Sequence, residues 1–215
     1  MVTRTTFASR EEWLEARRQR IGGSDAACIL GLNPYKSNVQ LWQEKMGQLE
    51  PKDISENELV RYGTQAEPFL RELFKLDHPE LTVFYEPDNI WFNDRFPFAH
   101  ASLDGWFEDK DGRKGVFECK TSTITNSAQA EKWNHRVPMN YYIQICWYLG
   151  VTEFDLAILR AQLKFSHGSE VYIQIREYTI ERQDVEEDIG VVMDAGREFA
   201  EAMRKGVCPP LELNI

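Results

Sequence analysis

Residues 115–121 read Gly-Val-Phe-Glu-Cys-Lys-Thr, and this stretch decides the fold because a glutamate and a lysine close an apolar run. It is predicted to be a buried β-strand, in which Glu118 and Lys120 share one face because strand side chains alternate. Upstream, residues 103–105 read Leu-Asp-Gly and place an aspartate after another apolar run. If the two stretches form adjacent strands, the carboxylates of Asp104 and Glu118 converge beside the Lys120 ammonium.

Two carboxylates beside a fixed cation suit a magnesium ion that assists phosphodiester cleavage, because Mg²⁺ prefers hard oxygen ligands. Each residue also has a purely structural explanation. Asp104 could begin a β-turn at Gly105, and Glu118 with Lys120 could be an exposed pattern of charges. The neighbours of Glu118 are apolar, however, and a buried ionisable pair indicates a functional site more strongly than an exposed one.

Two helices are predicted to add polar side chains to this site. In the helix predicted over 57–76, Glu67 lies on an otherwise apolar stripe, where a carboxylate is costly to bury without a partner. The alternative is a glutamate on the helix surface. In the aromatic helix predicted over 138–149, Gln144 needs partners, and a water or phosphate oxygen at the metal site would provide them. Core packing is the simpler explanation of Tyr148, one turn further along.

The segment 17–25 reads Arg-Arg-Gln-Arg-Ile-Gly-Gly-Ser-Asp, a pattern that suits phosphate binding. Glycines let the backbone approach an oxyanion closely, and arginines supply bidentate donors. Ser24 or Asp25 is predicted to cap a short helix that follows. The alternative is a basic helix end followed by a glycine turn. The segment is not a P-loop, because it lacks the Gly-Lys-Ser/Thr signature.

The composition is that of an ordinary soluble chain, with 215 residues, of which 42% are hydrophobic and 28% charged. This length supports one sizeable domain. No apolar run reaches the ~18–20 residues of a membrane span, and the N-terminus lacks the apolar core of a signal peptide. The four cysteines are scattered, which predicts reduced thiols in the cytoplasm and disfavours an iron–sulfur cluster. The four scattered histidines disfavour a zinc site.

The charge is distributed unevenly along the chain. The net charge is −10, which argues against a general nucleic-acid coat protein. Residues 1–48 nevertheless carry seven Lys or Arg and five Asp or Glu, whereas residues from 170 onward carry five basic and eleven acidic side chains. The pattern is compatible with a local phosphate-binding face on an acidic body, and equally with an ordinary solvated acidic helix.

The order of predicted elements indicates an α/β (α+β) fold with a central mixed sheet flanked by helices. The whole chain, 1–215, is predicted to be one nuclease domain. It divides into an N-terminal helical phosphate-binding segment (9–48), a core (57–180) and a C-terminal helix (183–205). Predicted helices cover 9–20, 26–30, 38–46, 57–76, 138–149 and 183–205, with a kink or restart at Pro68. Predicted strands cover 81–92 (one strand, or a pair around Glu86-Pro87), 98–108, 115–121, 154–165 and 169–179, the last two joined around His167-Gly168.

Short motifs in a fixed order along the chain give the sequence a family likeness. They lie at 13–17, 21–25, 29–36, 41–42, 62–63, 67–68, 101–105, 117–121 and 142–148. In this order they resemble the phage YqaJ-type recombinases, relatives of the lambda-type alkaline exonuclease within the PD-(D/E)xK nuclease superfamily. The resemblance implies a restriction-endonuclease-like core.

The resemblance also implies a role for individual residues. Asp104 and Glu118 are expected to be the magnesium ligands, with the Cys119 backbone carbonyl as a third and Glu67 completing the shell; Mn²⁺ is a possible substitute. Lys120 is expected to orient or activate the attacking water, and Gln144 to lie near the reaction. Arg17 and Ser24 are expected to contact the 5′ phosphate.

The activity implied is digestion of one strand of linear double-stranded DNA from its 5′ end, leaving a 3′ overhang for a single-strand annealing protein in phage-type recombination. The expected partners are DNA ends, the annealing protein and two further copies of the chain in a ring-shaped homotrimer, with no membrane. The expected location is the cytoplasm of a bacterial host that carries the phage or prophage. Two alternatives stay open: a site- or structure-specific endonuclease of the same superfamily, and a non-catalytic module that binds DNA ends.

Overall fold

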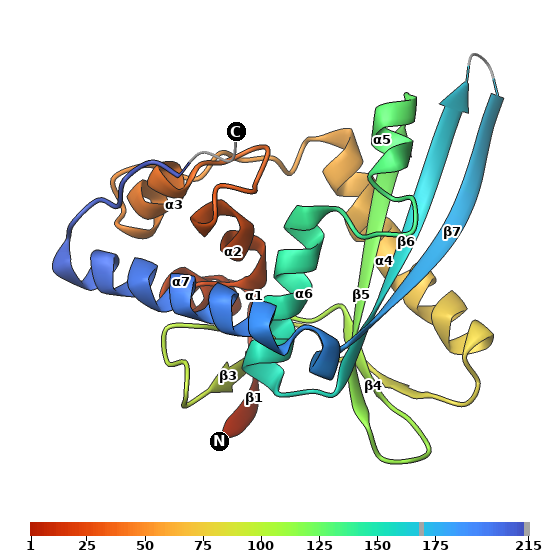
Figure 1. Cartoon of the computed structure of the whole chain (residues 1–215), viewed down its shortest axis with the longest axis horizontal. Coiled ribbons are helices and arrows are strands. Elements are labelled where there is room, and N and C mark those ends of the chain that lie inside the picture. The colour runs from red at the N-terminus through yellow and green to blue at the C-terminus, as the bar shows by residue number, and fades with distance from the viewer. Residues whose placement is uncertain (168–169, 213–215) are drawn as a thin grey trace.

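A five-stranded sheet forms the centre of the molecule in the computed structural model, which describes residues 1–167 and 170–212 (Figure 1). The strand order is β2-β4-β5-β6-β7, and β5 and β6 are parallel whereas the other neighbours are antiparallel. The predicted mixed sheet flanked by helices is therefore confirmed. The strands are β2 (Thr82–Phe84), β4 (Gly105–Glu108), β5 (Lys114–Ile124), β6 (Leu156–His167) and β7 (Glu170–Glu181). A separate pair joins β1 (Val2–Thr6) to β3 (Asn89–Asn93).

Helices cover both faces of this sheet. They are α1 (Arg10–Arg18), α2 (Gly23–Ile29), α3 (Asn38–Lys45), α4 (Glu58–Asp77), α5 (Ser127–Glu131), α6 (Met139–Thr152) and α7 (Glu186–Lys205), with a 3-10 turn at Arg182–Asp184. Helix α6 connects the parallel strands β5 and β6 and is almost entirely buried. It packs against α2 and α7 as well as the sheet, whereas α4 packs on β5 (Figure 1). No helix of the described residues is both long and apolar enough to cross a bilayer.

The alternation of side chains along β5 separates two hydrophobic clusters. Val116 joins the main cluster, which includes residues of α2, α6 and α7. Phe117 and Cys119 join a second cluster with Leu70 and Phe74 of α4. Glu118 therefore lies on the same face of β5 as Val116, the face that packs toward α6, because strand side chains alternate with a period of two.

Several predicted boundaries are wrong. Helix α2 begins at Gly23 with Gly22 as its N-cap, so neither Ser24 nor Asp25 caps it; instead the Asp25 carboxylate reaches back to the Gly22 N–H. The strand predicted over 98–108 begins only at Gly105. Pro68 lies inside α4, which runs through it as one helix rather than restarting there. The predicted turn at Gly168 lies outside the described residues.

Two glycines of α7 test how closely that helix packs. A Cβ added at Gly196 would lie 2.6 Å from the ring of Trp147, which is fully buried, whereas a Cβ at Gly190 would meet nothing within 4 Å. We expect Gly196→Ala to lower the free energy of unfolding by about 1–3 kcal/mol through overpacking. Gly190→Ala should raise it by about 0.5–1 kcal/mol, because alanine has the higher helix propensity. Denaturant unfolding of both variants checks the pair, and equal effects would contradict this packing.

Candidate active site

The predicted pairing of Glu118 and Lys120 on one face of β5 is present. The Lys120 Nζ atom lies 2.6 Å from Glu118 Oε1, and the Glu118 side chain is only 2% exposed. Glu118 pairs with Leu159 of β6 in the sheet, so the carboxylate is fixed in the middle of the two parallel strands. A buried carboxylate paired in this way is positioned rigidly, because neither partner can move without leaving a charge unpaired.

Gln144 of α6 reaches the same carboxylate. Its amide donates a hydrogen bond of 2.8 Å to Glu118 Oε1 and another of 2.8 Å to the Tyr148 hydroxyl. The partners that a buried glutamine requires are therefore protein groups. Glu118 Oε1 thus accepts two bonds, while Glu118 Oε2 is buried without a hydrogen-bond partner. Burial and the nearby Asp104 charge raise the pKa of Glu118 to about 8, although Lys120 opposes this shift.

Asp104 lies directly before β4 and is held from two sides. Its Oδ2 atom accepts a 3.0 Å bond from the backbone N–H of Cys119, next to Glu118. Its backbone carbonyl accepts a 2.7 Å bond from the Arg71 guanidinium of α4. The Asp104 carboxylate is therefore bonded to the backbone of the residue that follows Glu118.

Glu67 approaches this pair from α4. Its Oε1 atom lies 3.3 Å from the buried Arg71 guanidinium, which also binds the Asp104 carbonyl. Burial and the charge of Asp104 raise the pKa of Glu67 to about 7, whereas Arg71 lowers it. The third acid thus shares the electrostatic environment of the other two.

The oxygen atoms of this site are suitable ligands for a hard divalent cation. They do not form a complete coordination shell by themselves. Glu118 Oε2 is a buried carboxylate oxygen without a partner, which is the chemistry such a cation requires. Among residues 1–167 and 170–212, no three His, Cys, Asp or Glu side chains stand close enough together to hold a metal ion by themselves. A cation at Asp104 and Glu118 would need backbone, water or phosphate oxygens to complete its shell, as Mg²⁺ commonly does.

The glycines at the start of α2 are linked to Glu118 through two side chains, Tyr148 and Gln144. A Cβ added at Gly23 would lie 2.5 Å from the ring of Tyr148, whose hydroxyl accepts the Gln144 amide. Ser24 is exposed at the start of α2, and the Arg17 guanidinium lies 4.2 Å from the Trp13 ring centroid. In the described part of the chain, neither residue forms a hydrogen bond or ion pair with the acids, so their phosphate contacts stay predictions.

Three polar residues near the site escaped sequence reasoning. The ring nitrogens of His100 and the hydroxyl of Ser102 are buried without hydrogen-bond partners, and the His100 ring packs beneath Gly22. His100 and Ser102 alternate with apolar residues in the segment before Asp104. This alternation in the sequence could have identified the two residues. Arg71 stands one helical turn after Glu67, and that spacing was the signal for it.

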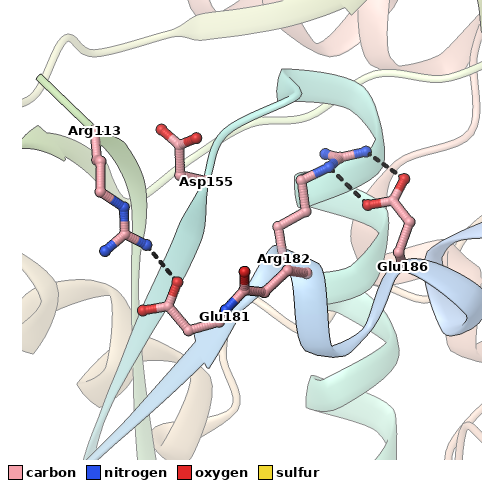
Figure 2. A pocket seen from close by; sticks show the side chains of 6 residues that line it. Arg113, Asp155, Glu181, Arg182 and Glu186 are labelled. Atoms are coloured by element: carbon pink, nitrogen blue, oxygen red, sulfur yellow. Dashed lines mark hydrogen bonds and ion pairs between the residues drawn. The ribbon is translucent and has the colours of Figure 1, made fainter.

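A separate open cavity of about 770 Å³ lies where β5 and β6 begin and β7 ends (Figure 2). Its two arginines each face a carboxylate: Arg113 pairs with Glu181, and Arg182 pairs with Glu186 (Figure 2). In the described part of the chain, none of the residues that line this cavity forms a hydrogen bond or ion pair with Glu67, Asp104 or Glu118, so it is separate from the acids.

Comparisons with known proteins give consistent results. The family model described as the YqaJ-like viral recombinase domain matches residues 12–155. The Bacillus subtilis (strain 168) protein named "Uncharacterized protein YqaJ" is 32% identical over 151 residues, which make up 70% of this chain and 45% of that protein. The chain therefore spans less than half the length of that relative.

Two solved structures share the fold. An alkaline exonuclease from Laribacter hongkongensis has a TM-score of 0.66 at 19% identity, covering 91% of this chain and 95% of that one. A phage related exonuclease from Haemophilus somnus 129PT has a TM-score of 0.57 at 14% identity, covering 87% and 96%. At these identities the likeness concerns the fold.

Arg71 should make stability depend on pH. The pKa of Glu67 in the folded protein, about 7, lies above its ordinary value, so the protonated carboxyl of Glu67 favours the folded state. This contribution to stability is complete at low pH and is lost as the pH rises through about 7. Arg71→Met removes the cation that limits this loss. We expect the variant's deficit in Tm, measured with chelator present, to be larger near pH 8.5 than near pH 5.5. The same substitution in a Glu67→Gln background should show a smaller pH dependence; an unchanged one would exclude Glu67 as its source.

Proposed function

Because the chain belongs to the family of YqaJ-like viral recombinase domains, we propose that it is a magnesium-dependent deoxyribonuclease that digests one strand of linear duplex DNA from its 5′ end. One observation carries the proposal: Glu118 is buried with one oxygen saturated by Lys120 and Gln144 and the other oxygen without a partner. A carboxylate in that state is expensive unless a cation completes it.

The residues that would hold Mg²⁺, or Mn²⁺ in its place, are Asp104, Glu118 and the Cys119 carbonyl, with Glu67 at the edge of the shell. When bound, the cation supplies charge stabilisation to the phosphate and lowers the pKa of water. Asp104 and Glu118 contribute fixed negative charge from two directions. The Cys119 N–H keeps the Asp104 carboxylate in one orientation.

Lys120 remains an ammonium in this site, because the carboxylates of Glu118 and Asp104 raise its pKa above the usual range. A permanently charged Lys120 orients the attacking water and stabilises the developing phosphate charge more readily than it removes a proton. Gln144 fixes Glu118 Oε1 and leaves Oε2 for the cation.

The proposed direction of digestion rests on the family resemblance, and we propose the glycine turn at Gly22-Gly23 as the place where the 5′ end binds. Arg17 and Ser24 would bind the 5′ phosphate there, while the next phosphodiester reaches the acids across Tyr148. Cleavage would release short 5′ products and leave the 3′ overhang that a single-strand annealing protein uses. A homotrimer around the DNA, encoded by a phage or prophage and acting in the bacterial cytoplasm, completes the proposal.

The first test is Lys120→Ala. We expect cleavage of end-labelled linear duplex with Mg²⁺ to fall by about 10²–10⁴-fold, because the water is no longer oriented, while binding of the same DNA in chelator is retained. Lys114→Ala, an exposed lysine at the start of the same strand, serves as the control and should cleave normally. Near wild-type cleavage by Lys120→Ala would contradict this role. Cleavage of covalently closed circular duplex would indicate an endonuclease instead.

Arg17→Ala tests the 5′ phosphate contact. The variant should lose activity on 5′-phosphorylated linear duplex by about tenfold or more, the effect of one charge-assisted contact, and much less on duplex with 5′ hydroxyl ends. Arg10→Ala is the matched control, since the Arg10 guanidinium also lies over the Trp13 ring, at 4.8 Å. Equal losses on both kinds of end, or equal behaviour of the two variants, would remove Arg17 from phosphate recognition.

A further inference from the structure

The Lys45 ammonium joins three helices at one point. Lys45 is the last residue of α3, and its Nζ atom lies 2.7 Å from the Arg20 carbonyl and 3.4 Å from the Arg17 carbonyl, at the end of α1. The same atom lies 2.9 Å from Asp25 Oδ2 in the first turn of α2. An ammonium has three N–H donors, so each of them can meet a protein acceptor here. Lys45 is therefore placed to hold α1 and α2 together rather than to bind a ligand.

The Asp25 carboxylate is the other half of this connection. Its Oδ2 atom also accepts a 3.1 Å bond from the Gly22 N–H, and the side chains of Lys45 and Asp25 are only 12% and 19% exposed. Burial by itself would raise the pKa of Asp25, but the Lys45 ammonium and the Gly22 N–H hold that pKa below its ordinary value. The pair is therefore ionised at neutral pH and adds no net charge to the glycine turn.

This ion pair lies between the two expected phosphate contacts. Arg17 supplies one of the carbonyls that Lys45 binds, and Ser24 directly precedes Asp25 in the chain. The spacing of Arg17 and Ser24 thus depends on the bonds that the single Lys45 ammonium makes to α1 and α2.

The segment before Asp104 fixes the glycine turn separately. The Ile21 N–H donates to the Phe98 carbonyl at 2.9 Å, and the His100 N–H donates to the Ile21 carbonyl at 2.9 Å. The His100 ring fills the place of a side chain at Gly22, where an added Cβ would lie 2.8 Å from His100 Nε2. Asp104 follows four residues after His100 in the same segment. The distance from the turn to the acids is therefore set by backbone bonds in which Lys45 takes no part.

We propose that Lys45 is a positioning residue for the end-binding site, defined as Arg17 with residues 22–24. Its ammonium holds Arg17 and Ser24 at the spacing that a 5′ phosphate requires, and it thereby sets the preference for phosphorylated over hydroxyl ends. Because the acids are fixed independently, Lys45 acts on recognition of the end and not on the chemistry at Asp104 and Glu118. This inference rests on the proposed function, in which Arg17 and Ser24 bind the 5′ phosphate.

The experiment compares binding of linear duplex with 5′ phosphate and with 5′ hydroxyl ends in chelator, where cleavage cannot interfere. Lys45→Met keeps the length of the side chain and removes the ammonium. It should lower the preference for phosphorylated ends on the order of tenfold, because a displaced binding group loses much of its effect, and leave the affinity for hydroxyl ends unchanged. Lys36→Met is the matched control, since the Lys36 ammonium also pairs with a glutamate of α3. In an Arg17→Ala background, Lys45→Met should change the preference much less, because the group that it positions is already absent.

A second variant separates positioning from stability. Lys45→Met leaves the Asp25 carboxylate without its cation, so the second variant combines Lys45→Met with Asp25→Asn, whose amide oxygen can still accept the Gly22 N–H. We expect this double variant to regain most of the wild-type Tm while it keeps the lowered preference for phosphorylated ends.

A preference of Lys45→Met equal to that of Lys36→Met would overturn the inference, and so would a double variant that regains the wild-type preference together with the Tm. An effect of Lys45→Met that is undiminished in the Arg17→Ala background, or a wild type without any preference, would do the same. Magnesium-dependent cleavage of linear duplex by the wild type, measured in parallel, reports on the proposed function by itself. A wild type that prefers phosphorylated ends but cleaves no DNA would leave the role of Lys45 standing and remove the nuclease proposal.

Discussion

The carboxylate of Glu118 is placed in the interior of the sheet, and the surrounding structure is arranged to tolerate it. The Lys120 ammonium and the Gln144 amide satisfy one oxygen, and the other is left buried without a partner. Desolvating a charge at this position is costly, and removing either partner would leave an uncompensated group. Strand β5 and helix α6 are thereby tied to one point, and helix α4 joins the neighbouring acid through the bond from Arg71 to the Asp104 carbonyl.

The two faces of the sheet bring different residues to the acids. The face toward α6 carries Glu118 and leads through Tyr148 to the glycine turn before α2. The other side carries α4, whose Arg71 donates a hydrogen bond to the Asp104 carbonyl. Although the net charge of the chain is −10, two cations lie beside its acids: Lys120 of β5 pairs with Glu118, and Arg71 of α4 pairs with Glu67. The net charge of −10 is therefore compatible with the nucleic-acid substrate proposed above.

Much of this arrangement could be predicted from short-range patterns in the sequence. The period of two put Glu118 and Lys120 on one face, and the apolar neighbours predicted the burial that the structure shows. A glutamine in an apolar helix indicated that Gln144 needed partners, although that reasoning expected water or phosphate rather than Glu118 and Tyr148. Other features depend on contacts between distant segments. Asp104 is fixed by the backbone of Cys119 without being in a strand itself, and β1 forms only because β3 offers it an edge. Neither contact leaves a local signal.

The central claim is that Glu118 keeps a carboxylate oxygen for a divalent cation. Calorimetric titration of Mn²⁺ into the protein without DNA tests it most directly, with Glu118→Gln beside the wild type and Glu187→Gln, an exposed acid of α7, as the control. Saturable binding by the wild type and the control, weakened at least about tenfold in Glu118→Gln, is the expected result. Equal Mn²⁺ binding by all three proteins, or none by the wild type, would contradict it.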